Sequence, residues 1–220
     1  MKKPSVFSFL ITLLLAAAVC IQGREPVKDT DGNSLMDRTK YFIKPANNNG
    51  GGLVPAAINI LPFCPLGITQ TLLPYQPGLP VSFHLPIGGK PPVSTSLPVS
   101  IDFKSDIWPV CTEFSKFWKV DDSPSASEEP AVLIGGKRFD ENSHFKIEKA
   151  GEGEGSNTYK LTTSYGTVGA IPGGWIGALQ LIVTNDTAKT LLVKFNKVDD
   201  ATTTSTSRVE KLGLRMFPFY

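Results

Sequence analysis

The sequence predicts an all-β protein, and two features carry that prediction. Short runs rich in β-branched and aromatic residues recur along the chain, and some alternate apolar with polar side chains, as in Leu97–Phe103. Glycine and proline, 20 and 18 of the 220 residues, separate these runs. The sequence shows no helical pattern of three or four turns. Such short, punctuated strands are typical of a β-sandwich or a β-barrel, and the pattern alone does not distinguish the two.

The expected strands follow one another with short polar or glycine-rich connections. The first ends in the β-favouring residues Tyr41–Ile43, after a turn at Asp31–Gly32. Leu97, Val99, Ile101 and Phe103 should share one buried face of a later strand. Further strands are expected at Leu53–Leu61 (interrupted by Pro55), Gly67–Gln70, Val81–Leu85, Phe117–Val120, Phe145–Glu148, from Tyr159 onward, Trp175–Val183 and Leu191–Val198.

The first 23 residues have the pattern of a secretory signal peptide. Lys2 and Lys3 form a basic start, and Val6–Val19 is an uncharged apolar run too short to span a membrane comfortably. We expect cleavage after Gly23, with Cys20 as the alternative position. Residues 1–23 are therefore excluded from the folded domain, which is expected to span 24–220 without a membrane anchor.

The charge balance excludes some classes of partner. The chain has 22 basic and 20 acidic residues, and without Lys2 and Lys3 the two counts are equal. A basic nucleic-acid-binding surface and an acidic solvating tail are both unsupported by this balance. The remaining 197 residues are enough for one domain with a sizeable core.

Two cysteines remain after the signal segment, Cys64 and Cys111. In a secreted chain they most simply form one disulfide, and two free thiols are the alternative. A bridge closing a loop of this length contributes roughly 4 kcal/mol in the chain-entropy model, less any native strain.

The sequence lacks the usual enzymatic constellations. His84 and His144 have no motif around them, and no H-E-x-x-H, paired-cysteine metal site, phosphate loop or G-x-S-x-G elbow is present. No glycine pair is followed by a helix that could hold a phosphate. We therefore expect a protein that is not an enzyme, with no catalytic residue, no metal site and no cofactor.

Several motifs together resemble the plant Kunitz-type (soybean trypsin inhibitor-like) family. Its N-terminal signature places an aliphatic residue, an aspartate, an acidic-glycine turn and a tyrosine at fixed spacing. The matching residues here are Val27, Asp29, Asp31, Gly32, Leu35, Tyr41 and Ile43. Cys64-Pro65-Leu66 and Ala131–Gly136 resemble two further family segments, and the spacing from Cys64 to Cys111 matches the first family disulfide.

This resemblance implies a fold that the sequence pattern does not supply. Members are β-trefoils, with about twelve strands in three pseudo-repeats around a closed barrel. No threefold repeat is visible in the sequence itself. The chain departs from the family in lacking cysteines for a second disulfide, and in an atypical C-terminal extension at 199–220.

The resemblance also implies a function, peptidase inhibition through an exposed substrate-like loop. Between two strands, residues 86–96 form a proline-stiffened loop, and rigidity of this kind lowers the ordering cost of binding. Alignment on a family proline places the primary-specificity position at Gly88, with Gly89 and Lys90 as alternatives. The reactive-loop residues implied are Pro86, Ile87, Gly88, Gly89, Lys90 and Pro91.

Two departures argue against trypsin as the target. Trypsin-directed members carry arginine or lysine at that position, because an acidic pocket rewards a buried cation. Here the position is glycine, and Lys90 is followed by Pro91, which fits serine-protease clefts badly. Asp37 stands where family inhibitors place an asparagine that braces the loop, and an aspartate accepts hydrogen bonds but does not donate two.

The expected function is therefore a secreted, monomeric peptidase inhibitor, extracellular (apoplastic) or vacuolar, with a serine protease as partner and cysteine or aspartic proteases as alternatives. A non-inhibitory binding, storage or defence protein on the same scaffold is the second hypothesis, and a lectin-like carbohydrate binder the third. Asn185-Asp186-Thr187 is an N-glycosylation acceptor on an expected loop.

Overall fold

The computed structural model describes residues 24–47, 50–86, 89–105, 110–123, 129–151, 155–173 and 178–199. The expected signal peptide at 1–23, Ile87 and Gly88 of the expected reactive loop, and the extension from residue 200 lie outside these ranges. Among the described residues, no helix is long and apolar enough to cross a membrane.

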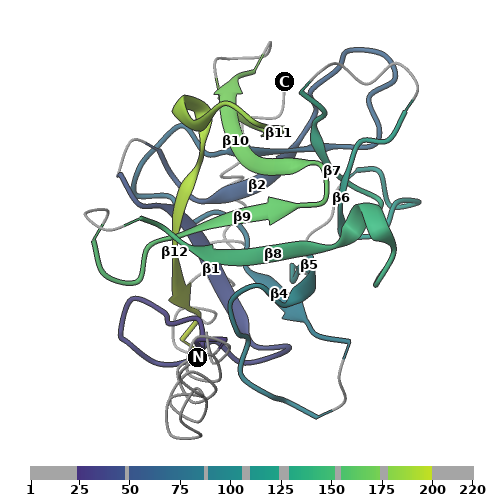
Figure 1. Ribbon diagram of the computed structural model, residues 1–220. Coiled ribbons are helices and arrows are strands. Elements are labelled where there is room, and N and C mark those ends of the chain that lie inside the picture. Colours follow the sequence, from purple (N-terminus) through teal and green to yellow (C-terminus); the bar gives the residue numbers. More distant parts are fainter. Residues whose placement is uncertain are drawn as a thin grey trace, which may run out of the picture.

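The chain folds into twelve strands and two short 3₁₀ helices, joined in one continuous sheet (Figure 1). The strands are β1 (Lys40–Pro45), β2 (Leu53–Ala56), β3 (Gly67–Gln70), β4 (Val81–His84), β5 (Pro98–Phe103), β6 (Trp118–Val120), β7 (Val132–Ile134), β8 (Phe145–Lys149), β9 (Tyr159–Thr163), β10 (Gly166–Pro172), β11 (Leu179–Thr184) and β12 (Leu192–Lys197). The 3₁₀ helices are η1 (Glu141–Ser143) and η2 (Thr187–Lys189).

Six of the strands form a closed barrel. They pair in the order β12-β1-β4-β5-β8-β9, and the β9–β12 pairing closes the ring. The other six form three hairpins, β2–β3, β6–β7 and β10–β11. Each group of four consecutive strands thus contributes its outer two to the barrel and its inner two to a hairpin. This threefold arrangement is the β-trefoil that the family resemblance implied.

Alternating apolar residues fill the barrel, as expected for strands with one buried face. Val99, Ile101 and Phe103 of β5 are all fully buried, which confirms the predicted face. Two aromatic clusters dominate the core. Trp118 packs against Phe103 and Phe145, and Phe83 packs against Tyr41 and Phe195, with Tyr159 beyond Phe195.

The strand predictions were wrong in three places, one of which is β7, whose residues were interpreted only as part of a family motif. The apolar run at Leu53–Leu61 is a strand only as far as Ala56. Residues 57–66 form the connection to β3, and this connection is tied to Cys111 through Cys64. The strand β10 was not predicted, because Gly166, Gly169 and Pro172 interrupt any apolar alternation in its sequence. Its pairing with β11 over six residue pairs supplies the order that the local sequence lacks.

Candidate functional site

The segment 24–39 is an N-terminal strap that runs beside residues 91–96. Val27 donates its backbone N–H to the carbonyl of Val93 at 2.9 Å, and Val93 donates to the carbonyl of Leu35 at 2.8 Å. All three side chains are fully buried. The expectation that 86–96 is exposed throughout is therefore wrong at Val93, where the strap and the barrel cover the chain.

Asp37 connects the two ends of the exposed part of this loop. Its carboxylate Oδ1 accepts a hydrogen bond from the backbone N–H of Leu85 at 2.8 Å, and its own N–H donates to the carbonyl of Pro91 at 3.1 Å. The side chain is fully buried, and Arg38 Nε lies 3.1 Å from the second carboxylate oxygen. Asp37 thus supplies an acceptor to one end of the loop, whereas an asparagine there could also donate from its side chain.

Between these two fixed ends, the described residues Pro86, Gly89 and Lys90 are all exposed, and Pro91 is half-buried. Gly89 has φ of +94°, a conformation that side chains disfavour. The structure thus brings the described members of the expected reactive loop together at one surface turn, with Lys90 as the cation among them.

A buried polar cluster lies directly before this loop, on β4 and β5. His84 Nε2 is 2.8 Å from Asp102 Oδ1, and Lys104 Nζ is 2.6 Å from Asp102 Oδ2. The His84 ring packs edge-on against Phe117 at 5.3 Å. No serine or cysteine nucleophile bonds to His84, whose Nδ1 has no hydrogen-bond partner among the described residues. The cluster therefore links β4 to β5 through the hydrogen bond between His84 and Asp102.

Exposed apolar side chains gather in the connections on either side of β3. Before β3, Ile60 and Leu61 are 67% and 88% exposed and Phe63 is 42% exposed. After β3, Tyr75 is 77% exposed. Of the eight large exposed apolar residues among those described, six belong to these two connections: Ile60, Leu61, Phe63, Leu72, Leu73 and Tyr75. We call residues 60–63 the apolar segment.

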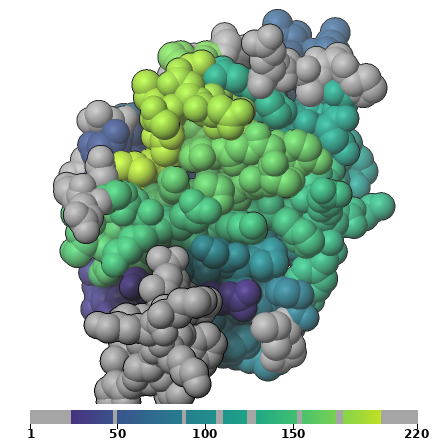
Figure 2. All heavy atoms as spheres, viewed as in Figure 1, coloured from purple at the N-terminus to yellow at the C-terminus, as the bar shows by residue number. Residues whose placement is uncertain are grey.

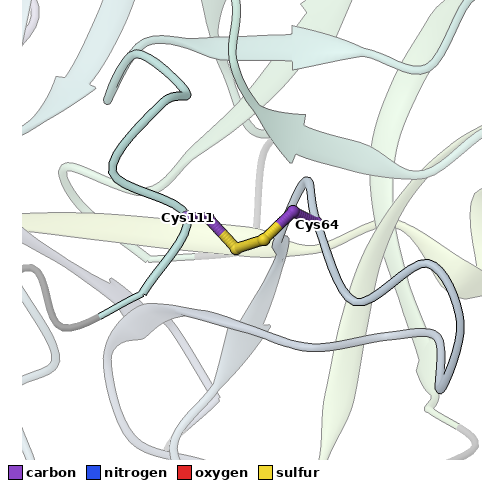
Figure 3. The surroundings of a disulfide bond; sticks show 2 residues. All are labelled: Cys64 and Cys111. Atoms are coloured by element: carbon purple, nitrogen blue, oxygen red, sulfur yellow. A yellow bond between two sulfur atoms is a disulfide. The ribbon is translucent and has the colours of Figure 1, made fainter.

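The disulfide anchors the apolar segment to the rest of the molecule. Cys64 bonds to Cys111 with 5.8 Å between the two Cα atoms, so the pairing expected from the sequence is present. Figure 3 shows that the bond joins the connection before β3 to the connection between β5 and β6. Immediately after it, Leu66 is buried and accepts a hydrogen bond from the N–H of Ile134. The apolar segment therefore projects from a firmly held base.

One depression among the described residues has a volume of about 160 Å³ and is lined by Asn47, Gln70, Ala170, Leu179 and residues 188–191. Ligand pockets typically measure roughly 300–1,000 Å³. No group of three or more histidine, cysteine, aspartate or glutamate side chains in the described part of the chain could hold a metal ion.

The apolar segment is the feature that sequence reasoning missed. Its residues were interpreted as the end of a strand, because isoleucine, leucine and phenylalanine favour strands. Pro62 in this segment and Pro65 just after it could have identified it. Proline has no backbone N–H to donate to a neighbouring strand, so it disfavours a central strand.

The fold is a β-trefoil, and comparison with known proteins identifies its family. Residues 27–197 match the sequence profile of the Kunitz family described as "Trypsin and protease inhibitor". The chain belongs to this family. It is 69% identical over 210 residues to Kunitz trypsin inhibitor 2 of Arabidopsis thaliana, covering 94% of this chain and 98% of that protein.

Two solved structures with the same fold differ in what their titles say they bind. One is a water-soluble chlorophyll protein from Brassica oleracea var. botrytis with chlorophyll b, at 66% identity and a TM-score of 0.76, covering 80% of this chain and all of that one. The other is soybean trypsin inhibitor in complex with porcine pancreatic trypsin, at 28% identity and a TM-score of 0.66, with the same coverage. The relatives are therefore named as inhibitors or pigment-binding proteins, and none of these three is named as an enzyme.

Proposed function

We propose that this chain is a secreted, non-enzymatic binding protein that takes up chlorophyll through the apolar segment. The observation that carries the proposal is the exposure of Ile60 and Leu61, beside the half-exposed Phe63. Exposed apolar residues that cluster on a soluble protein indicate an interaction site. The 66% identity to a chlorophyll-bound protein supports chlorophyll as the ligand.

The residues present fit an amphiphilic ring system of this kind. Full burial of a leucine-sized side chain is worth about 1.5–3 kcal/mol, so three such residues supply a substantial driving force. From Ala57 to Pro65, the backbone carbonyls accept no hydrogen bond from other described residues. Magnesium prefers oxygen ligands, and these carbonyls are the oxygen donors beside the apolar segment. Chlorophyll itself would supply light absorption.

The proposal is tested by adding chlorophyll b in detergent to the purified protein and measuring pigment that co-elutes on size-exclusion chromatography. Leu61→Asp should weaken pigment retention by about tenfold or more, since it replaces the most exposed apolar side chain with a charge. Its folding stability should change by less than about 0.5 kcal/mol, as is usual for surface substitutions.

A matched control is Tyr165→Asp, which alters a half-exposed aromatic residue in the β9–β10 turn. This variant should retain the pigment at the wild-type level. Equal retention by all three proteins, or failure of the wild type to retain any pigment, would refute binding through the apolar segment.

Peptidase inhibition remains the second candidate, and the observation in its favour is Asp37. Asp37 bonds to both Leu85 and Pro91 and so fixes the two ends of the expected reactive loop, and pre-organisation strengthens inhibitor binding. The 69% identity to a protein named as a trypsin inhibitor also supports it. The glycine at the expected specificity position favours a target other than trypsin.

This second candidate is tested by titrating the pigment-free protein against serine, cysteine and aspartic proteases. Lys90→Ala should abolish inhibition if Lys90 occupies the specificity pocket, whereas Lys28→Ala, in the strap, should leave inhibition unchanged. No inhibition of any protease at micromolar concentration would remove this candidate without affecting the chlorophyll proposal.

A further inference from the structure

The turn between β11 and β12 presents a feature that neither candidate function uses. Asn185 follows directly on the last residue of β11, and Thr187 begins η2. Together with Asp186 they form Asn-x-Thr, the acceptor sequence for N-linked glycans, and this tripeptide occurs once in the 220 residues. In Figure 1 this turn is the short yellow-green coil that precedes β12.

Alternate residues of the turn have separate roles. Thr184 Oγ1 accepts a hydrogen bond from the N–H of Asp186 at 3.0 Å and donates to Glu129 Oε1 at 2.8 Å. Asp186 Oδ1 accepts from the N–H of Ala188 at 2.9 Å and so caps η2. Residues 184 and 186 therefore hold the backbone, whereas Asn185, whose Oδ1 lies near Gly166, and Thr187 remain exposed at the outer side of the turn.

Both outward residues are available for chemistry. Asn185 and Thr187 are exposed, and neither side chain makes a hydrogen bond to another described residue. Lys189 also holds the turn in place, because its Nζ lies 2.6 Å from Glu129 Oε1. On its other flank, Thr190 bridges to Gly169 of β10. Figure 2 shows the yellow-green atoms of this part of the chain standing at the surface of the molecule.

We propose that Asn185 carries an N-linked oligosaccharide, added as the chain enters the secretory pathway. The acceptor tripeptide is complete, both of its defining side chains face solvent, and the intervening residue is engaged in holding the turn. A glycan attached here would extend away from the protein without breaking a hydrogen bond between described residues. This inference does not rest on chlorophyll binding or on protease inhibition.

The modification is a group transfer from a lipid pyrophosphate-linked oligosaccharide, catalysed by a host glycosyltransferase. The Asn185 amide Nδ2 forms a bond to the anomeric carbon of the first sugar and loses one proton to a base. The bond between that carbon and the pyrophosphate oxygen breaks, and the lipid pyrophosphate leaves with the electron pair.

The test is expression of the full chain, including residues 1–23, in plant leaves, followed by mass measurement of the purified protein. The wild type should be heavier than its polypeptide by the mass of a glycan. Digestion with peptide-N-glycosidase A should remove that mass and convert residue 185 to aspartate in peptide mass spectra. Chain made in bacteria supplies the unmodified reference.

Three variants separate glycosylation from other causes of a mass shift. Asn185→Gln and Thr187→Ala should lose the glycan completely, whereas Thr187→Ser, which keeps a hydroxyl in the acceptor, should retain it. Both positions are exposed and outside the core, so the fold should be preserved. The Cys64–Cys111 disulfide, read from the mass change on reduction and alkylation, reports passage through an oxidising compartment.

Three outcomes would overturn the proposal. The first is a processed, disulfide-bonded chain with unmodified Asn185. The second is a chain that retains residues 1–23 and carries no glycan, since it would not have met the transferase. A glycan that persists in Thr187→Ala would place the modification elsewhere and would also overturn it.

Discussion

Buried carboxylates and phenols organise the backbone around the strap. Asp29, which is fully buried, accepts hydrogen bonds at Oδ1 from the N–H groups of Asp31 and Asn33, at 3.0 and 2.8 Å. Asp37 acts similarly on the loop that follows β4. Removing the Asp37 acceptor would leave the N–H of the buried Leu85 unpaired, which costs about 1–3 kcal/mol. These side chains therefore matter for loop geometry, whichever ligand the protein binds.

Tyr41 is a buried phenol whose contribution to the stability of the fold depends on pH. Its hydroxyl accepts a hydrogen bond from the Met36 N–H at 2.9 Å inside the barrel, and burial raises its pKa above the usual 10.0. Because the folded protein disfavours the phenolate, this contribution to stability is fully present below the ordinary pKa and is lost as the pH rises through the folded value. We expect the free energy of unfolding to decline above about pH 10.

The measurement is urea unfolding of wild type and Tyr41→Phe at neutral and alkaline pH. The free energy of unfolding of Tyr41→Phe should be lower than that of the wild type by about 1–3 kcal/mol at neutral pH, because the Met36 N–H loses its acceptor. Between neutral and alkaline pH, the free energy of unfolding should fall less for Tyr41→Phe than for the wild type. Tyr75→Phe, at a highly exposed position, is the control and should follow the wild type. Identical alkaline losses in all three proteins would contradict the prediction.

The β2–β3 hairpin is the element that presents the exposed apolar side chains. Its open end is closed by tight backbone contacts between residues 51–52 and the connection after β3. Gly52 donates to the carbonyl of Gln76 at 2.8 Å and accepts from the N–H of Thr71 at 2.9 Å. A Cβ on Gly52 would lie 1.8 Å from the carbonyl oxygen of Pro77, so the backbones approach closely only because residue 52 is glycine.

We therefore expect Gly52→Ala to destabilise the protein by about 1–3 kcal/mol, the usual cost of overpacking. Thermal or urea unfolding would measure this loss. Gly151→Ala is the matched control, because its Cβ would meet nothing within 4 Å and its backbone conformation suits other residues. A Gly52→Ala protein as stable as Gly151→Ala would show that the hairpin end can relax.

The disulfide adds a covalent link between two units of the trefoil that the β4–β5 and β3–β7 pairings also join. Cys64 belongs to the first four-strand unit and Cys111 to the second, 47 positions further along the chain. The bond therefore adds constraint to the unfolded chain and fixes the base of the apolar segment.

Replacing both cysteines, as Cys64→Ala with Cys111→Ala, should lower the free energy of unfolding by about 4 kcal/mol in the chain-entropy model. Urea unfolding would measure the loss, and wild type held in reductant should show a similar one. The double variant should also retain less chlorophyll, because the apolar segment loses its anchor. An unchanged unfolding midpoint would contradict the role assigned to the bond.

Several elements could be predicted from local sequence because their side-chain pattern is sufficient. The strand β3 matches its predicted bounds, and β5, β8 and β12 differ from theirs by only a residue or so at an end. Alternation of apolar and polar residues specifies strands such as β5 and β8 without knowledge of their partners. The strand β10 could not be found in this way, since its ladders with β11 and β9 hold it extended.

The sequence by itself determined the all-β class, the family motifs, the single available disulfide pairing and the glycan acceptor at Asn185. Each depends on residue identity and spacing along the chain, which sequence records directly. The tertiary structure decided that Val93 is buried beneath the strap, that Asp37 holds both ends of the loop, and that Ile60 and Leu61 face solvent. Burial depends on what packs against a side chain from distant segments, and local propensity contains no information about those segments.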